Sequence, residues 1–227
     1  TVLIGGRVRC VSEPAEDPYF VMLTPECGPW SQVQHLNEPE QVAMKQQRER
    51  KDIQFCWQIA NFQNERGRGF AYEQPWNARS WEERDVQRIR QIAGVEFVRT
   101  DMCMFGLRCV LTGEAMQKAT GILTNVPEFA EAIQRRCDKS HPHGMSLGRE
   151  NTKNAGKFVP QFVNAALRGL SDALARGGTF RPRGRERQRH QFFCDRSVCQ
   201  KKAIELGNFF CEVIRSWIVD TDDLEVE

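Results

Sequence analysis

The sequence predicts an α/β domain in which helices cover both faces of a mostly parallel sheet, followed by a helical appendage at the C-terminus. Short apolar runs alternate with helical patterns in the order strand, helix, strand, helix, strand, which is typical of right-handed crossovers between parallel strands. The first apolar run, YFVML, is uninterrupted, as in strands that are buried on both faces. With 227 residues, of which 40% are apolar, the chain can form one core of ordinary size.

The first strand and helix are predicted in the N-terminal third of the chain. The apolar run at residues 19–23 lies between two prolines, which limit the strand, and a tight turn, ECGPWSQ, follows it. Asn37 and Glu40 have the spacing of a capping box, and Pro39 fits the first turn of a helix, where its missing N–H costs nothing. We expect this helix to end near Glu65.

The same alternation continues with a second strand and helix and a third strand. FAY at residues 70–72 is predicted as a strand that runs into a glutamate and a proline. Ser80 and Glu83 form a second capping box that opens a helix, and Gly94 ends it. The third strand begins at Val95.

The next region predicts a further strand and two helices. KATGILTN, residues 118–125, has the composition of a strand. VPEFAEAIQRRC is predicted as a short helix with Phe129 and Ile133 facing inward. In residues 158–170 the spacing of Phe162, Ala166 and Leu170 predicts an amphipathic helix.

Composition divides the chain into three parts and limits its class. We expect an α/β domain at 1–175, an arginine-rich linker at 176–192, and a helical segment with an acidic tail at 193–227. The net charge of +2 gives no global field, so any affinity for nucleic acid must come from local patches. The arginine run is equally consistent with phosphate binding and with a solvated linker. Nine cysteines without a secretory segment or a membrane-spanning apolar run predict an intracellular protein, nuclear or cytoplasmic, with no membrane partner.

Three polar residues follow the predicted strands directly. Cys27, Glu73 and Asp101 fall just past the carboxyl ends of consecutive strands, where parallel sheets bind their ligands. A thiol on a tight turn can act as a nucleophile, and a carboxyl group beside it can protonate the ring that the thiol attacks. Either residue alone would be an ordinary turn cysteine or surface acid, so the prediction depends on the pair.

These segments resemble motifs of cytosine-5 DNA methyltransferases. TPECGPWS resembles their Pro-Cys loop, and FAYEQPW resembles the strand end that carries their glutamate. DMCMFGL followed by KATGILTN is similar to a stretch of divergent phage and retroelement-associated members of the family. The similarity extends from about Asp17 to Leu170 and implies a Rossmann-like methyltransferase sheet, at least in part.

The resemblance also implies a reaction and its residues. Cys27 would attack C6 of a cytosine, Glu73 would hold and protonate N3, and S-adenosylmethionine would then methylate C5. The base must leave the duplex first, at a cost of a few kcal/mol. Pro25 and Asp101 are the residues that would contact the cofactor.

Cations near these segments would hold the DNA phosphates, and we name Arg79, Arg108 and Lys118 as candidates. The sequence departs from the family pattern at Glu26, where a proline is usual, and at Gln74, where an asparagine is usual. It also lacks the Gly-rich strand and turn that hold the cofactor in this family. We therefore expect either a fragment whose cofactor-binding half lies upstream of Thr1 or an inactive relative.

A second cluster of potential ligands lies in CDKSHPHG. Cys137, His141 and His143 fall within seven residues, and Cys103 and Cys109 lie not far upstream. Zinc prefers such ligands in a tetrahedron, but this spacing matches no common zinc finger. The sequence therefore favours a polar loop over a metal site, and zinc is not expected.

Three functions are consistent with these observations. The first is an S-adenosylmethionine-dependent cytosine-5 DNA methyltransferase-like domain. The second is a non-catalytic nucleic-acid-binding or structural segment of a mobile-element polyprotein. The third is a zinc-stabilised binding module organised by the Cys/His cluster.

Overall fold

The structure, a computed structural model, describes residues 18–144 and 149–177. The predicted C-terminal segment at 193–227 and all but the first two residues of the linker at 176–192 lie outside the described residues. The strands are β1 (Phe20–Leu23), β2 (Gly69–Pro75), β3 (Glu96–Asp101) and β4 (Ala119–Thr124). The α-helices are α1 (Pro39–Glu65), α2 (Arg84–Arg90), α3 (Pro127–Ile133), α4 (Arg149–Ala155) and α5 (Pro160–Ala175). The short 3-10 helices are η1 (Gly28–Trp30), η2 (Gln32–Leu36), η3 (Arg79–Glu82) and η4 (Met102–Phe105).

The four described strands form one sheet in the order β1-β2-β4-β3. β1 and β2 are parallel, whereas β4 runs antiparallel to both β2 and β3. The α/β class is therefore confirmed, but the prediction of a mostly parallel sheet is wrong because β4 runs against both of its neighbours. A parallel connection usually needs a crossover helix, and the segment between β3 and β4 contains no α-helix, only the 3-10 turn η4 and a short antiparallel bridge between Arg108 and Ala115.

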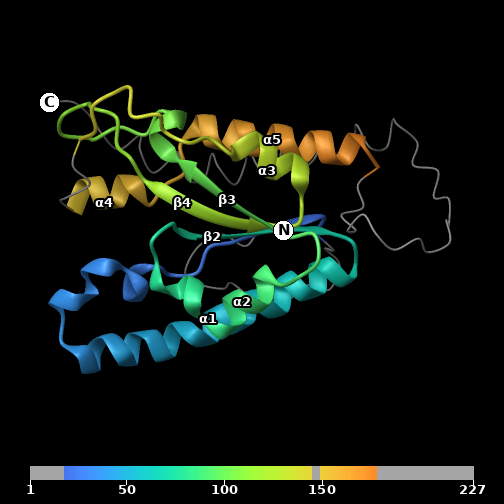
Figure 1. Cartoon of the computed structure of the whole chain (residues 1–227), viewed down its shortest axis with the longest axis horizontal. Helices are drawn as coiled ribbons and strands as arrows, with labels where there is room; N and C mark the ends of the chain where they lie inside the picture. Colours follow the sequence, from blue (N-terminus) through green and yellow to red (C-terminus); the bar gives the residue numbers. More distant parts are fainter. Residues whose placement is uncertain (1–17, 145–148, 178–227) are drawn as a thin grey trace, which may run out of the picture.

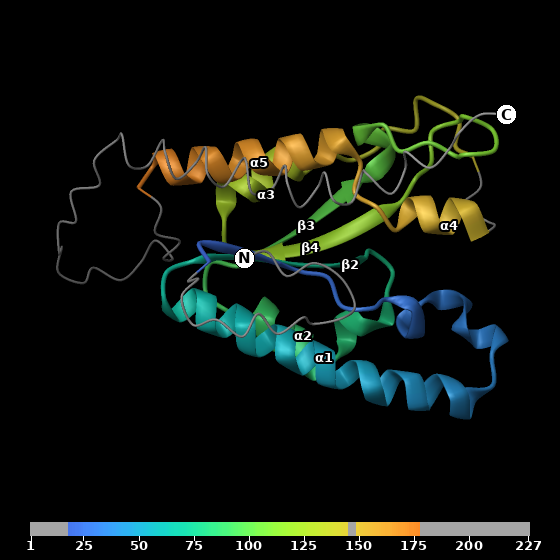
Figure 2. The ribbon, with the colours of Figure 1, turned by 180° about the vertical axis from the view of Figure 1, so that it is seen from behind.

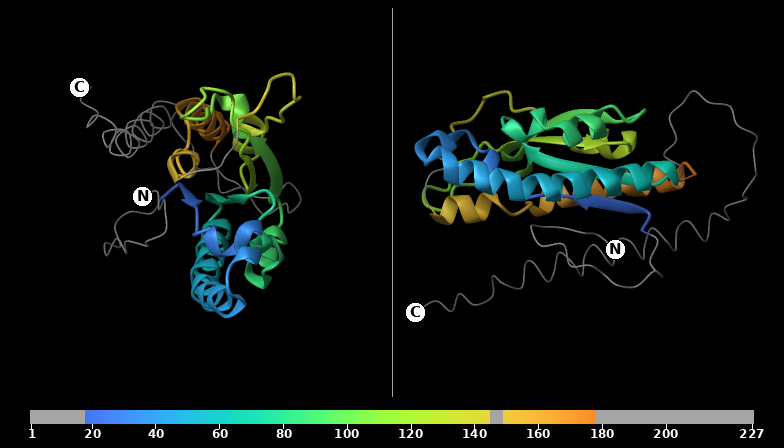
Figure 3. Two further views of the ribbon diagram at one scale, coloured as in Figure 1. Left: turned by 90° about the vertical axis from the view of Figure 1, so that its left-hand side faces the viewer. Right: turned by 90° about the horizontal axis from the view of Figure 1, so that it is seen from below.

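Helices cover both faces of this sheet, as predicted. α1 and α2 lie on one face, and α3 and α5 lie on the other (Figures 1 and 2). The view along the sheet in Figure 3 shows the same layers. In β1, Phe20 and Met22 belong to the core under α3 and α5, while Val21 and Leu23 belong to the core over α1 and α2. This alternation explains why the first apolar run is uninterrupted.

Both predicted capping boxes are wrong, although the helices that they were meant to open exist. The amide of Asn37 donates to the Gln34 side chain in the preceding 3-10 turn, and α1 begins after Glu38 without a side-chain cap. Ser80 is buried, and its hydroxyl donates to Oε1 of Gln74. In both places a residue with capping chemistry finds its partner in a neighbouring turn or strand.

The two helices on the upper face in Figure 1 pack closely. Phe162, Ala166 and Leu170 of α5 are buried, and so are Phe129 and Ile133 of α3, which confirms the predicted inward faces.

Within residues 18–144 and 149–177, no helix combines the length and the apolar character needed to cross a membrane.

Candidate functional site

The turn after β1 presents a thiol at the surface. Cys27 is exposed, and its carbonyl oxygen accepts a hydrogen bond of 3.0 Å from the N–H of Trp30. That bond closes the 3-10 turn η1, and the Trp30 side chain is buried in the core over α1. The buried ring anchors the turn, so the thiol stays at the surface while the chain reverses.

Glu73 lies near the end of β2, on the strand beside β1, and is buried. Nζ of Lys118 is 3.8 Å from Oε1 of this carboxyl, and that oxygen has no hydrogen-bond partner. Burial raises the pKa of Glu73, and the nearby ammonium of Lys118 opposes the shift. Because β4 runs antiparallel to β2, its first residues lie at the carboxyl end of β2, which brings Lys118 to Glu73.

The thiol and the carboxyl group are close enough to influence each other electrostatically. The pKa of Cys27 is raised, first by desolvation among the surrounding residues and then by the charge of Glu73. Lys118 acts in the opposite direction, and Glu26 makes a smaller contribution that raises the pKa. The two side chains predicted as a pair therefore lie at the same edge of the sheet. Lys118 partly offsets the effect of the Glu73 charge on the pKa of Cys27, which remains raised.

Gln74 connects the cysteine turn to β2. Its Nε2 donates to the carbonyl oxygen of Pro25 over 2.8 Å, and its Oε1 accepts from Ser80 over 3.1 Å. Gln74 is 1% exposed; its hydrogen bond with Ser80 is buried, and the one to Pro25 is partly buried. Gln74 thus holds the turn of Cys27 against the strand of Glu73.

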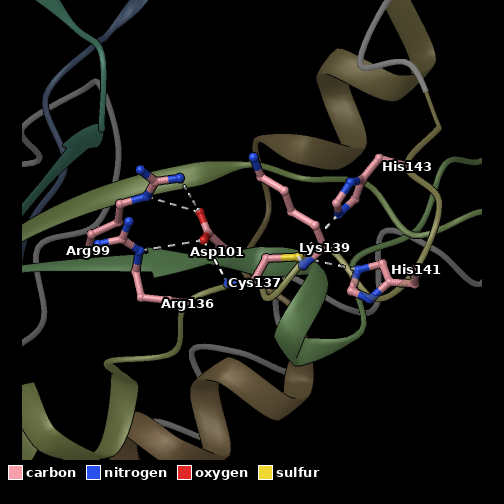
Figure 4. A network of polar contacts seen from close by, with 7 residues as sticks. All are labelled: Arg99, Asp101, Arg136, Cys137, Lys139, His141 and His143. Atoms are coloured by element: carbon pink, nitrogen blue, oxygen red, sulfur yellow. Dashed lines mark hydrogen bonds and ion pairs between the residues drawn. The ribbon is translucent and has the colours of Figure 1, made fainter.

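Asp101 lies at the carboxyl end of β3, where it organises a polar network (Figure 4). Its Oδ1 accepts from the guanidinium of Arg99 at 3.1 and 3.2 Å, and its Oδ2 accepts from the N–H of Cys137 at 2.9 Å. Arg136 adds an ion pair at 3.9 Å. Since the side chain is 1% exposed and both oxygens have partners, Asp101 presents no free oxygen to a cofactor.

The three cations proposed for phosphate contacts occupy different positions. Lys118 is half-buried beside Glu73, whereas Arg79 and Arg108 are exposed. Arg108 donates to the carbonyl oxygen of Gly113 over 2.9 Å. Of the three, only Lys118 is paired with a predicted catalytic residue.

The cluster around Cys137 gains a fourth member in the structure. The ligand atoms of Cys103, Cys137, His141 and His143 all lie within 4.8 Å of one another. Cys103 belongs to η4, directly after β3; the sequence named it with Cys109 as an upstream cysteine but did not show which of the two joins the cluster. Cys109, the other upstream candidate, is not a member of this group, and its sulfur accepts a hydrogen bond from Asn151.

Comparisons of the chain with protein-family models, with curated proteins and with solved structures gave no match. The assignment of a function therefore depends on the residues described above.

Proposed function

We propose that this chain provides the base-binding part of a cytosine-5 DNA methyltransferase-like domain, with Cys27 as nucleophile and Glu73 as acid. The observation that carries the proposal is that an exposed thiol, in the turn after β1, and a buried carboxyl group, near the end of β2, lie on two neighbouring parallel strands, and that the hydrogen bond from Gln74 to Pro25 ties the turn to β2. Such an edge is where α/β sheets bind ligands.

The chemistry that these residues can perform is a reversible addition to a cytosine ring. The Cys27 thiol first gives its proton to solvent; the thiolate sulfur then forms a bond to C6, the electrons of the C5–C6 double bond move to C5, and Glu73 gives its proton to N3. The raised pKa of Glu73 favours the protonated acid that this step requires. Lys118, 3.8 Å away, then stabilises the carboxylate that remains. Elimination of the thiolate restores the ring.

S-adenosylmethionine has no fitting partner among the residues proposed for it. Asp101 is engaged with Arg99 and Cys137, and the carbonyl of Pro25 accepts from Gln74. The proposed function therefore contains no step that uses this cofactor. The sheet itself is compatible with a Rossmann-like methyltransferase, because doubly wound sheets accommodate an antiparallel strand beside their parallel ones.

The proposal is tested by exchange of the C5 hydrogen, which requires the addition but no methyl donor. The full chain is incubated with DNA that carries tritium at C5 of cytosine, as single strand and as duplex, and tritium released to water is measured. When the thiol adds to C6, C5 takes a proton from solvent, and elimination then releases the label. We expect release by the wild type, none by Cys27→Ser, and strongly reduced release by Glu73→Gln. The matched controls Cys56→Ala and Glu82→Gln should behave as the wild type.

A second candidate function follows from the raised pKa of Cys27, which favours the less reactive thiol over the thiolate at neutral pH. On this basis the domain would bind nucleic acid without reacting with it. DNA binding of equal affinity in the wild type and Cys27→Ser, with no exchange in either, would favour this function and contradict the first. Exchange that persists in Cys27→Ser would contradict the proposed nucleophile.

A further inference from the structure

We propose that Cys103, Cys137, His141 and His143 form a structural zinc site that joins the end of β3 to the loop after α3. The four residues each offer one ligand atom, and these atoms gather within 4.8 Å. Two thiolates and two imidazoles are a ligand set typical of structural zinc. This site is independent of the proposed reaction at Cys27.

The separations agree with tetrahedral coordination. With Zn–S near 2.3 Å and Zn–N near 2.05 Å, a tetrahedral angle places sulfur and nitrogen about 3.6 Å apart. Sγ of Cys137 lies 3.7 Å from Nε2 of His141 and 3.5 Å from Nε2 of His143. Both rings direct the same nitrogen at the sulfur (Figure 4), and their centroids are 4.7 Å apart in a T-shaped arrangement. The remaining pairs of ligand atoms are no more than 4.8 Å apart.

Backbone hydrogen bonds fix the position of Cys137 and reach its sulfur. Its backbone N–H donates to Asp101, and its sulfur accepts from the N–H of Lys139 over 3.3 Å. Lys139 has φ of 63°, the only positive φ of a non-glycine residue in the described part of the chain. This strained conformation directs its N–H at the sulfur. Such contacts outside the ligand set orient ligands and stabilise their charge.

Charge and burial also fit a closed site. The formal charges of two thiolates and one divalent ion sum to zero. The bound metal therefore adds no net charge near Arg99, Arg136 and Lys139. Cys103 is 8% exposed and the other three ligands are half-buried. Four protein ligands leave no position open for substrate, which indicates a structural role.

The ion would stabilise a segment that has little apolar packing of its own. Residues 134–144 contain no helix and no strand of the sheet, and most of their side chains are exposed. Direct contacts to the domain come from Asp101, from the hydrogen bond between Gly144 N–H and the Ala115 carbonyl oxygen, and from Arg135 over the Phe105 ring. A metal ion shared with Cys103 would fix this loop to η4.

The test measures metal content of the full chain purified under reducing conditions. We expect about one zinc ion per chain, and cobalt substitution should give the visible bands of a tetrahedral ion together with thiolate charge transfer. Cys103→Ser and His143→Ala should lose stoichiometric zinc. Cys109→Ser, which changes a buried thiol outside the group, should keep it. The double change Cys194→Ser with Cys199→Ser, in the segment CDRSVC near the C-terminus, should keep it as well.

A variant that replaces one metal ligand by another distinguishes loss of the site from misfolding of the chain. His143→Cys should still bind zinc, and its cobalt form should show stronger thiolate charge transfer because a third sulfur has joined the site. Absence of stoichiometric zinc in the wild type would overturn the proposal. Zinc that is retained in Cys103→Ser, or a disulfide between Cys103 and Cys137 in place of metal, would overturn it as well.

Discussion

Glu49 of α1 should make the stability of this domain depend on pH. It is 5% exposed, and burial together with the charges of Glu26 and Asp52 and a hydrogen bond to Glu26 raises its pKa from 4.5 to about 7. The folded state therefore binds a proton that the unfolded state has already released between these values. Because the unfolded state binds fewer protons there, stability falls as pH rises through this window.

Replacing Glu49 by Gln should remove this dependence, because the amide imitates the protonated acid and keeps a donor for Glu26. The change in pKa from 4.5 to about 7 corresponds to about 3 kcal/mol, which screening by nearby solvent reduces to about 2 kcal/mol. Denaturant unfolding of both proteins should give equal stabilities near pH 4 and a variant more stable by about 2 kcal/mol near pH 8. Glu40→Gln, an exposed change on the same helix, should leave the profile of the wild type unchanged. Parallel profiles for the wild type and Glu49→Gln would refute the reasoning.

Two further changes test the packing and the turn. In Gly169→Ala the new methyl group would lie 2.6 Å from the carbonyl oxygen of Glu128 and 2.7 Å from Cα of Phe129, so α3 and α5 must separate, and we expect a loss of about 1–3 kcal/mol in unfolding free energy. A variant as stable as the wild type would show that the helices do not approach so closely. Gln74→Ala removes the hydrogen bonds to Pro25 and from Ser80; we expect a loss of about 1–3 kcal/mol and slower tritium exchange. If neither the unfolding free energy nor the rate of tritium exchange changed, Gln74 would not hold the turn.

The sequence predicted the strands and the buried helix faces because these are determined by local patterns of apolar residues. It could not predict the direction of β4, since no local pattern distinguishes an antiparallel return from a parallel crossover in KATGILTN. It also misplaced the helix caps at Asn37 and Ser80, because such side chains bond either within the helix end or to a tertiary neighbour.

In the candidate sites, too, some features follow from the local sequence and others depend on the tertiary fold. The proximity of Cys27 and Glu73 was predictable, since two neighbouring parallel strands bring their carboxyl ends together. The ion pair of Lys118 with Glu73 was not, because it depends on the antiparallel entry of β4 beside β2. Cys103 joins His141 and His143 only through the fold of two separate segments, so a search for closely spaced ligands could not select it.

The position of β4 also has a consequence for the biogenesis of the domain. It is the last of the described strands to leave the ribosome, yet it lies between β2 and β3. Until residues 119–124 emerge, β3 has no neighbour to bond with, and one side of β2 presents unpaired backbone groups. A nascent chain that stalls before this point would expose unpaired backbone groups on both β2 and β3, which makes premature termination there a route to aggregation.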